Sequence, residues 1–281
     1  MGDRVDGVAF VTGAGRGIGR ACCERLLADG WTVVAGVRDV ERARSDYGSP
    51  RGLEIVACDV TDPGSVAAAV AAAEQSGPIR ALVLNAGHAM FSTVEETDQD
   101  IARAMFEVNV FGAGNVLRSA LPGMRGSGGV VVFISSIAAR GASPMLGWYS
   151  ASKAALASIG ESLATEAAPF GIRVAMLEPG MVATGFSQAT RISGAATAGE
   201  GPYAPLFGGM LGAFGRWRER YSSTAEDVAA AVAAAIADPA TPLRAPVGDD
   251  ARELMEIIAG APEADARRTT VRDFLGVDWG S

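Results

Sequence analysis

The sequence predicts an α/β protein with a mostly parallel, doubly wound sheet and helices on both faces. Short apolar runs rich in β-branched residues alternate with helical stretches along the 281 residues. Several of these runs are apolar throughout, as expected for strands that are buried on both faces. Alternating strands and helices favour a parallel sheet, because a helix must carry the chain back before the next parallel strand begins. A chain of this length can form one α/β domain, so we expect residues 1–281 to be a single domain.

Seven segments are predicted strands. Six are clear apolar runs and the last is shorter. In chain order the segments are 8–13, 32–37, 53–58, 80–87, 128–135, 172–180 and 242–248.

Six helices are predicted between and after these strands. Gly30 and Gly77 are typical helix stops, and Pro63 suits the first turn of a helix. The third helix is expected to break near Val108. The predicted helices are 17–30, 62–77, 97–124, 150–168, 224–237 and 249–259.

Residues 185–216 lack a clear period and are interpreted as a substrate lid, since long unpatterned segments inside compact folds often have a function. Residues 260–281 are expected to form a tail over the surface. Two interpretations of the apolar side chains in and near the lid stay open: a lining for a hydrophobic substrate, or ordinary packing of the lid on the core. These side chains are Met145, Met181, Phe186, Phe207, Met210, Phe214 and Trp217.

Composition argues against several kinds of partner. The net charge is −8 without a basic block, which argues against nucleic acid. No apolar run approaches the ~20 residues that a membrane-spanning helix needs. Nothing near the N-terminus resembles a signal peptide, and Cys22, Cys23 and Cys58 lack metal-ligand spacing. We therefore expect a cytoplasmic protein with reduced thiols and no metal.

A glycine-rich loop, "TGAGRGIG" at 12–19, follows the first strand and opens the first helix. Gly13, Gly17 and Gly19 would let the backbone turn tightly and approach a pyrophosphate, which the positive helix N-terminus attracts. Glycine turns are common, but this strand–loop–helix context favours a dinucleotide site.

The end of the second strand bears on the choice of dinucleotide. An acidic residue there usually binds the ribose 2′-hydroxyl of NAD, but this position is Val37. Arg38 follows, and Arg16 lies in the glycine loop, so two guanidinium groups could bind the 2′-phosphate of NADP. Both could instead be solvated surface arginines. A shift in strand register would make Asp39 available for NAD, so we favour NADP(H) and keep NAD(H) as the alternative.

Two further features are ambiguous when each is taken alone. Asp59, in "CDVTD", could bond the adenine amine or act as a turn or capping residue. Tyr149 and Lys153, in "YSASK", would share a helix face and could form a simple surface pair. Alternatively, the Lys153 ammonium could lower the pKa of the Tyr149 phenol, which is normally about 10.

Six signals in this order resemble those of the short-chain dehydrogenase/reductases with a TGxxxGxG motif. They are the glycine loop, "NAG" (85–87), Asn109, Ser136, "YSASK" (149–153) and "PGMVAT" (179–184). The resemblance is strong over about 5–185 and looser beyond. "VRD" and "RAPVGDDA" look like the subgroup that includes 17β-hydroxysteroid and retinol dehydrogenases. One departure is Leu84, where many relatives have a second asparagine.

The resemblance implies a single-domain Rossmann fold with a seven-stranded sheet and a catalytic set of Asn109, Ser136, Tyr149 and Lys153. Tyr149 would exchange the proton, and Lys153 would support it and hold the nicotinamide ribose. Ser136 would bond the substrate oxygen, and Asn109 would hold a water that links Lys153 to solvent. Ser135 is the rival serine, although strand alternation would point it the other way.

The resemblance further implies which residues bind the cofactor. Pro179 and Gly180 would shape the nicotinamide pocket and Thr184 would bond the carboxamide. The full expected set is Gly13, Arg16, Gly17, Ile18, Gly19, Arg38, Asp59, Val60, Asn85, Ala86, Gly87, Tyr149, Lys153, Pro179, Gly180, Val182 and Thr184. His88 could line the mouth of the site or be a plain loop residue.

The sequence therefore predicts an NADP(H)-dependent oxidoreductase that interconverts a ketone or aldehyde and an alcohol on a hydrophobic small molecule. An NAD-dependent alcohol dehydrogenase of the same family is one alternative. A dinucleotide-sensing regulator without turnover is the other. The family resemblance implies a homodimer or homotetramer assembled through the helices at about 97–124 and 150–168.

Overall fold

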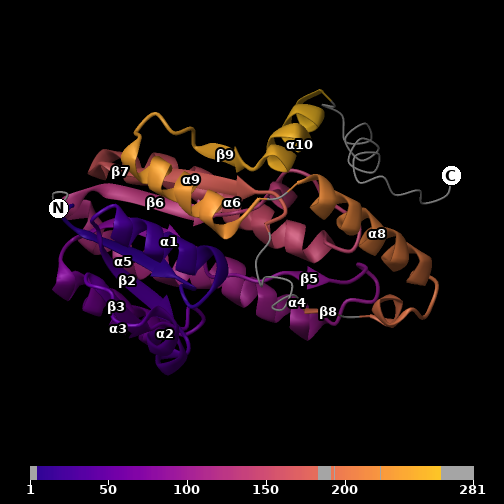
Figure 1. Cartoon of the computed structure of the whole chain (residues 1–281), viewed down its shortest axis with the longest axis horizontal. Helices are drawn as coiled ribbons and strands as arrows, with labels where there is room; N and C mark the ends of the chain where they lie inside the picture. The colour runs from indigo at the N-terminus through magenta and orange to yellow at the C-terminus, as the bar shows by residue number, and fades with distance from the viewer. Residues whose placement is uncertain (1–4, 183–190, 193, 222, 261–281) are drawn as a thin grey trace.

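A computed structural model describes residues 5–182, 191–192, 194–221 and 223–260. Its central feature is a parallel seven-stranded sheet in the order β3-β2-β1-β4-β6-β7-β9, which confirms the predicted fold class (Figure 1). The strands are β1 (Val8–Thr12), β2 (Thr32–Val37), β3 (Leu53–Ala57), β4 (Ile79–Leu84), β6 (Gly129–Ile134), β7 (Ile172–Pro179) and β9 (Arg244–Val247).

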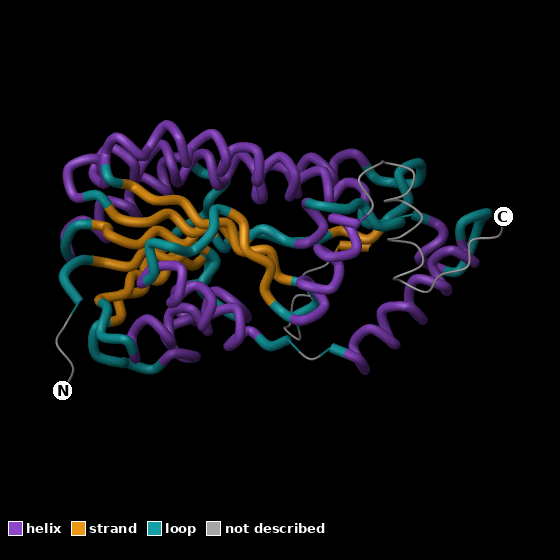
Figure 2. The backbone as a smooth tube through the Cα atoms, turned by 90° about the horizontal axis from the view of Figure 1, so that it is seen from above, coloured by secondary structure: helices purple, strands orange, loops and turns teal. Residues whose placement is uncertain are grey.

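Helices cover both faces of the sheet, and Figure 2 shows the strands between them. On one face lie α3 (Pro63–Ser76), α5 (Ala113–Ser127) and α6 (Gly147–Ala167). On the other lie α1 (Gly17–Ala28), α2 (Val40–Tyr47) and α9 (Ala225–Ala237). Alternate residues of β1 feed the two cores: Val8 and Phe10 pack into the first, Ala9 and Val11 into the second. This alternation follows from the period-2 geometry of a strand.

The predicted break near Val108 is present. The chain passes from α4 (Gln99–Phe106) through a π-helical turn, Glu107–Gly112, into α5. Such turns often occur at functional sites.

Two helices escaped the sequence prediction. The first is α2, which is short and begins after Asp39, whose Oδ1 accepts a hydrogen bond from Arg42 N. The second is α8 (Ala204–Arg220), so residues 204–216 of the expected lid form a regular helix. Its four glycines weaken the helix signal, because glycine costs about 1 kcal/mol against alanine in a helix interior. Residues 183–190 lie outside the described part of the chain.

A small second sheet and the last described helix lie beyond the carboxyl ends of the main strands (Figures 1 and 2). A two-stranded sheet pairs β5 (Met90–Phe91) with β8 (Arg191–Ile192). The helix α10 (Asp249–Gly260) follows β9 as predicted, and residues 261–281 of the expected tail are outside the described ranges. Short helical turns are Ile137–Ala139, Ala168–Phe170 and Ala195–Ala198. Among the helices that the structure describes, none has the length and apolar character of a membrane span.

Candidate active site

The glycine-rich loop turns tightly between β1 and α1. Gly13 (φ 65°) and Gly17 (φ 54°) have left-handed backbones that suit glycine. A Cβ at Gly19 would overlap the side-chain amide of Asn85, which donates hydrogen bonds to the carbonyl oxygens of Thr12 (2.9 Å) and Gly13 (3.1 Å). The predicted NAG segment therefore braces this loop directly.

Two hydroxyl groups reinforce the loop. Thr12 Oγ1 donates to Val83 O (3.2 Å) and accepts from the backbone N–H groups of Asn85 (3.1 Å) and Ala86 (3.2 Å), so it joins the ends of β1 and β4. The Tyr47 hydroxyl donates to Ala14 O at 2.6 Å. Sequence reasoning missed Tyr47, because it lies in the unpredicted helix α2, 33 residues from its partner.

The end of β2 has the predicted register. Val37 is the last residue of the strand and is buried, and Arg38 beyond it is exposed, as is Arg16. The Asp39 carboxylate caps α2 at 3.0 Å, so it already has a partner in the protein.

The Asp59 side chain stabilises a turn in this structure. Its Oδ1 accepts from Thr61 N (3.0 Å) and Thr61 Oγ1 (2.8 Å), which is the turn role that the sequence left open. These two bonds, with a smaller contribution from the charge of Arg38, lower the pKa of Asp59. The neighbouring Val60 is buried, and its carbonyl accepts from Asn115 Nδ2 at 3.0 Å.

The four predicted catalytic residues come from three different elements and are all buried. Ser136 follows β6 and caps the turn Ile137–Ala139, with its Oγ accepting from Ala138 N at 3.1 Å. Tyr149 and Lys153 lie in the first turns of α6, and Asn109 lies in the π-helical turn. The side chains of Ser136 and Tyr149 are hydrogen-bonded to each other, which identifies Ser136 rather than Ser135 as the tyrosine's partner.

Asn109 is held by its own network. Its Oδ1 accepts from His88 N (3.0 Å), and its Nδ2 donates to His88 O (2.9 Å) and Ser152 Oγ (3.1 Å). A Cβ at Gly87 would lie 3.1 Å from Asn109 Oδ1 and 3.6 Å from Lys153 Nζ. The NAG segment thus reaches from the glycine-rich loop to the lysine. His88 enters this network through its backbone, and Ser152 was not predicted.

The pKa values of Tyr149 and Lys153 correct the expectation that the lysine lowers the pKa of the tyrosine. Burial raises the pKa of Tyr149 to about 12, and the hydrogen bond with Ser136 opposes this rise. Burial lowers the pKa of Lys153 to about 8. Lys153 Nζ lies 5.9 Å from the centroid of the tyrosine ring and donates to Ile134 O at 2.9 Å. Desolvation therefore outweighs any lowering of the phenol pKa by the ammonium.

Gly180, at the end of β7, approaches a buried carboxylate that the sequence analysis missed. A Cβ at Gly180 would overlap the carboxyl group of Asp250, whose Oδ2 accepts from Met181 N at 2.6 Å. Val182 forms an isolated bridge with Ser223, and Thr184 lies outside the described residues. Asp250 lies in "RAPVGDDA", but that stretch did not indicate its contact with the backbone after Gly180, because the contact depends on α10 folding back toward the end of β7.

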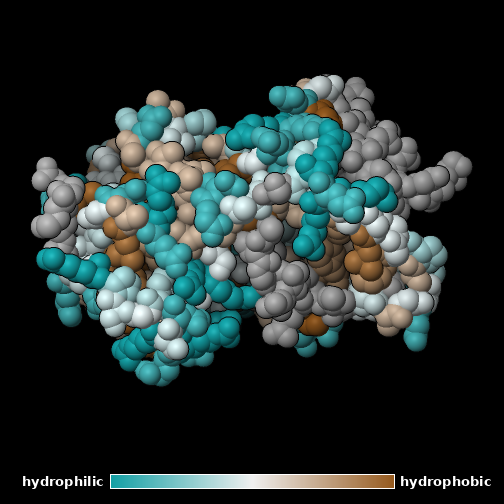
Figure 3. Space-filling view, viewed as in Figure 1, coloured by the Kyte–Doolittle hydropathy of each residue, from teal (hydrophilic) through white to brown (hydrophobic). Residues whose placement is uncertain are grey.

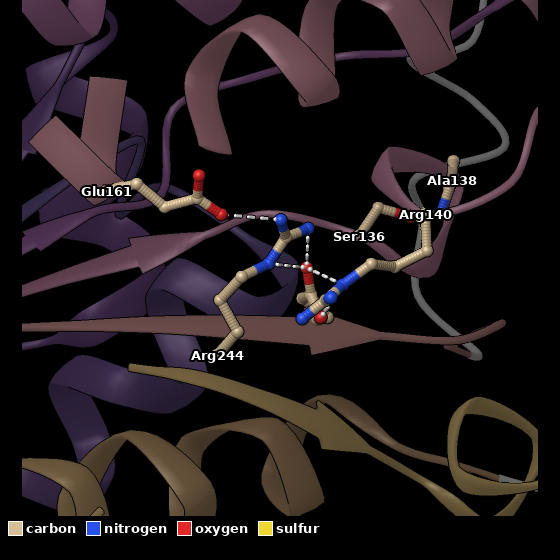
Figure 4. A network of polar contacts seen from close by, with 6 residues as sticks. Ser136, Ala138, Arg140, Glu161 and Arg244 are labelled. Carbon is tan, nitrogen blue, oxygen red and sulfur yellow. Dashed lines mark hydrogen bonds and ion pairs between the residues drawn. The ribbon is translucent and has the colours of Figure 1, made fainter. Parts of the chain in front are cut away.

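A second buried carboxylate, Glu178, lies just before Pro179. It accepts hydrogen bonds from Arg140, beyond β6, and from Arg244 in β9, and Arg244 also pairs with Glu161 of α6 (Figure 4). This network was not predicted from the sequence. It connects four elements near the catalytic residues.

An apolar cluster lies next to Ser136. Ile137 and Met145 pack with Met210 and Ala213 of α8 and with residues of α10. Hydrophobic side chains gather on the surface over α8 in Figure 3. Met145 has a left-handed backbone (φ 63°), which is rare for a residue with a side chain.

Aromatic rings extend this cluster. The Phe214 ring lies edge-on to Phe91, with centroids 5.3 Å apart, and stacks on Trp217 at 6.4 Å. Phe207 packs against the same cluster, Met181 is half-buried, and Phe186 is outside the described ranges. Most of the expected lid lining is therefore packed together.

Comparison with known proteins identifies the family of this chain. The model of the short chain dehydrogenase family matches residues 7–193, and the chain belongs to this family of oxidoreductases. Oxidoreductase BOA17 of Botryotinia fuckeliana is 32% identical over 87% of this chain and 89% of its own length.

Other curated relatives are matched over less of their own length. The uncharacterized oxidoreductase YusZ of Bacillus subtilis is 36% identical, over 63% of this chain and 65% of that protein. Mouse 17-beta-hydroxysteroid dehydrogenase type 1 is also 36% identical, over 64% of this chain and 55% of its own. The expected nearness to the hydroxysteroid dehydrogenase subgroup is thereby confirmed.

Solved structures share the fold over nearly the whole chain. A short-chain dehydrogenase from Streptomyces avermitilis covers 98% of both chains with a TM-score of 0.80 and 32% identity. One from Burkholderia cenocepacia, in complex with NADP, covers 98% of this chain and 100% of its own, with a TM-score of 0.74 and 31% identity. A 3-ketoacyl-(acyl-carrier-protein) reductase from Brucella melitensis, complexed with NADH, covers 85% and 96%, with a TM-score of 0.69 and 26% identity.

Proposed function

We propose that this protein is an NADP(H)-dependent oxidoreductase that interconverts a ketone or aldehyde and an alcohol on an apolar small molecule. One observation carries the proposal. The NAG segment packs against the glycine-rich loop at Gly13 and against Lys153 at Gly87, so a dinucleotide cradle and a buried Ser–Tyr–Lys group adjoin each other. That neighbourhood is what hydride transfer beside a proton donor requires.

The residues of the cradle fit a dinucleotide. Left-handed glycines at 13 and 17 leave the backbone bare where α1 begins, and an extended Arg16 precedes the helix. A helix N-terminus without side-chain bulk suits a pyrophosphate. Arg16 and Arg38 would neutralise a 2′-phosphate, and Asp39 is engaged as a helix cap rather than offered to a ribose.

The chemistry of the protein groups follows from their positions. A bound nicotinamide supplies the hydride. Ser136 would orient the carbonyl oxygen of the substrate beside Tyr149, which is protonated at neutral pH and can therefore donate a proton to that oxygen. Lys153 would stabilise the phenolate left behind, since burial strengthens electrostatic interactions. Asn109 anchors the π-helical turn next to the lysine, where we propose that a water refills the proton.

The apolar cluster over Ser136 supports a hydrophobic substrate. Ile137 and Met145 are buried under α8, and the ring stack continues along the same helix. Desolvated apolar walls with a few polar groups are typical of small-molecule sites.

We further propose that the protein assembles as a homodimer or homotetramer through its long helices. Phe111 is 57% exposed on the π-helical turn that leads into α5, so it could contribute to such an interface. Sedimentation of the purified protein tests this directly.

The first test replaces the proton donor. Tyr149→Phe should retain NADPH binding and lose at least about 10³-fold in kcat with a carbonyl panel, because it removes the hydroxyl that donates the proton. Tyr203→Phe is the matched control, because the Tyr203 hydroxyl instead pairs with Glu95 at 2.6 Å. Full activity in Tyr149→Phe would refute the assignment. NADPH binding by a wild-type protein without turnover on any carbonyl would favour the regulator instead.

The second test concerns the cofactor. Fluorescence titration should show tighter NADPH than NADH binding, and Arg16→Ala or Arg38→Ala should weaken NADPH binding by about tenfold while sparing NADH. Arg42→Ala, on the exposed side of α2, is the control. Tighter NADH binding by the wild type would overturn the proposed role of the two arginines.

A further inference from the structure

The buried carboxylate Glu178 has no exposed surface and is enclosed by two arginines. Arg140 Nε donates to its two oxygens at 3.1 and 2.9 Å. Arg244 donates through Nε at 2.8 Å and also through Nη2, and its Nη1 pairs with Glu161 at 2.8 Å. The two arginines and two glutamates balance in charge, which is the condition under which a buried ion group persists.

The two arginines differ in what they connect to Glu178. Arg244 lies in β9, which is already paired with β7 through Met176↔Arg244 and Glu178↔Pro246. Arg140 instead ends the short turn that Ser136 begins, and Figure 4 shows both residues on that turn. Ala139 N donates to Ser136 O (3.0 Å) and Arg140 N to Ile137 O (2.9 Å), so the turn is compact.

We propose that Arg140 is a positioning residue: its ion pair with Glu178 fixes the turn 136–140 on the end of β7 and so holds the Ser136 hydroxyl against Tyr149. This inference rests on the proposed function, because it concerns the orientation of the serine in that site. Arg140 Nε lies between the two oxygens of a fully buried carboxylate, so this charge-assisted pair constrains both the distance and the direction of the last residue of the turn from β7. Small displacements of a positioning group can cost up to about 100-fold in rate.

The Arg140–Glu178 pair also connects the turn that carries Ser136 to the segment proposed to bind the nicotinamide. Glu178 is followed by Pro179 and Gly180, the segment expected to shape the nicotinamide pocket. Arg140 therefore holds the substrate-oxygen side of the site to the strand that carries the nicotinamide side. The pair sets the relative position of the two halves.

The test compares Arg140→Met with Arg244→Met. Each variant removes one guanidinium from Glu178, so both should lower the melting temperature. Arg140→Met should lose about 10- to 100-fold in kcat with little change in the Kd for NADPH, because the misplaced Ser136 acts on the substrate. Arg244→Met should keep kcat within about threefold of wild type, since β9 remains paired with β7. Equal losses of kcat in the two variants, or none in Arg140→Met, would overturn the proposal.

A second readout does not require turnover. In protein labelled with ¹³C at the tyrosine ring carbon that bears the hydroxyl, the Tyr149 resonance is identified by its absence in Tyr149→Phe. It should move in Arg140→Met as it moves in Ser136→Ala, and stay in place in Arg244→Met. If the Tyr149 resonance does not move in Arg140→Met, the inference is contradicted. If the resonances shift as expected but the protein turns over no carbonyl, only the proposed reaction is contradicted. Should Arg140→Met fail to fold, Arg140→Lys, which keeps the charge but loses the fixed Nε–H donor of the guanidinium, should show the same shift in smaller measure.

Discussion

Burial shifts the pKa values of Tyr149 and Lys153 in opposite directions, and each shift favours the neutral form of the group. The phenol pKa rises to about 12 and the ammonium pKa falls to about 8. The phenol is thus protonated across the physiological range, and the lysine is the group of the pair that titrates near neutrality. Tyr149 is therefore a proton donor without any assistance from Lys153. The stabilisation of its phenolate by the Lys153 ammonium, in contrast, depends on pH.

A pH profile tests this difference. Lys153 is charged below about pH 8 and neutral above it, so kcat/KM for carbonyl reduction should be constant below this pH and fall above it. The descent should come well before about pH 12, where Tyr149 would lose its proton. Steady-state rates measured between pH 6 and 10 would locate the pH at which kcat/KM falls.

The matching control is Lys153→Arg, which stays charged throughout that range. Its activity should be lower, because a guanidinium is larger than the buried ammonium, but the descent near pH 8 should vanish. A descent at the same pH in this variant would exclude Lys153 as its source.

At the scale of elements, the site is built where several strands of the parallel sheet end. The glycine-rich loop follows β1, Arg38 follows β2, Asn85 follows β4 and Ser136 follows β6. Because the sheet is parallel, all these ends lie at one edge. The order β3-β2-β1-β4 reverses direction at β1, which is where such folds leave a crevice.

The short helix α2 carries a prediction of its own. Asp39→Ala should reduce the free energy of unfolding by about 1 kcal/mol, because the N-cap bond to Arg42 N is lost. It should leave the ratio of NADPH to NADH affinity unchanged, whereas Asp39→Ser should restore most of the stability. Denaturant unfolding and cofactor titration measure both quantities, and a selective loss of NADH affinity would show that Asp39 contacts the ribose.

At the scale of the molecule, the part of the chain beyond β7 folds back to complete the site. The buried Asp250 of α10 holds the backbone after Gly180, and Gly248 (φ 100°) also lies against its carboxylate. Burial raises the pKa of Asp250, and hydrogen bonds from Met181 and Ala251 oppose the rise. Two glycines thus make room for one carboxylate that joins the helix to the end of the sheet.

Gly180→Ala tests this junction. The added methyl group would overlap the Asp250 carboxylate, so we expect a loss of more than about 2 kcal/mol in the free energy of unfolding and weaker cofactor binding. Gly208→Ala is the control, since none of the residues that the structure describes lies within 4 Å of its exposed Cβ position, and it should stabilise by about 0.5–1 kcal/mol. Chemical denaturation compares the two. Similar stability in both variants would mean that Asp250 moves aside freely.

Prediction from sequence succeeded where local pattern is strong. Apolar runs bounded by glycine gave the strands, and the break near Val108 is the π-helical turn that presents Asn109. It failed for α8, where glycines hide the helical period. It also missed the contacts of Tyr47 and Asp250, because each residue contacts a partner far along the chain.

The sequence alone determined the sheet, the glycine-rich loop and the four candidate catalytic residues, because each depends on local spacing or on an ordered set of motifs. The tertiary structure decided that Ser136 rather than Ser135 meets Tyr149, that Asp39 caps a helix, and that burial dominates the acidity of the Tyr149–Lys153 pair. It also revealed the Arg140–Glu178–Arg244 network. These properties depend on long-range contacts and desolvation, which arise only when distant segments pack together and exclude water.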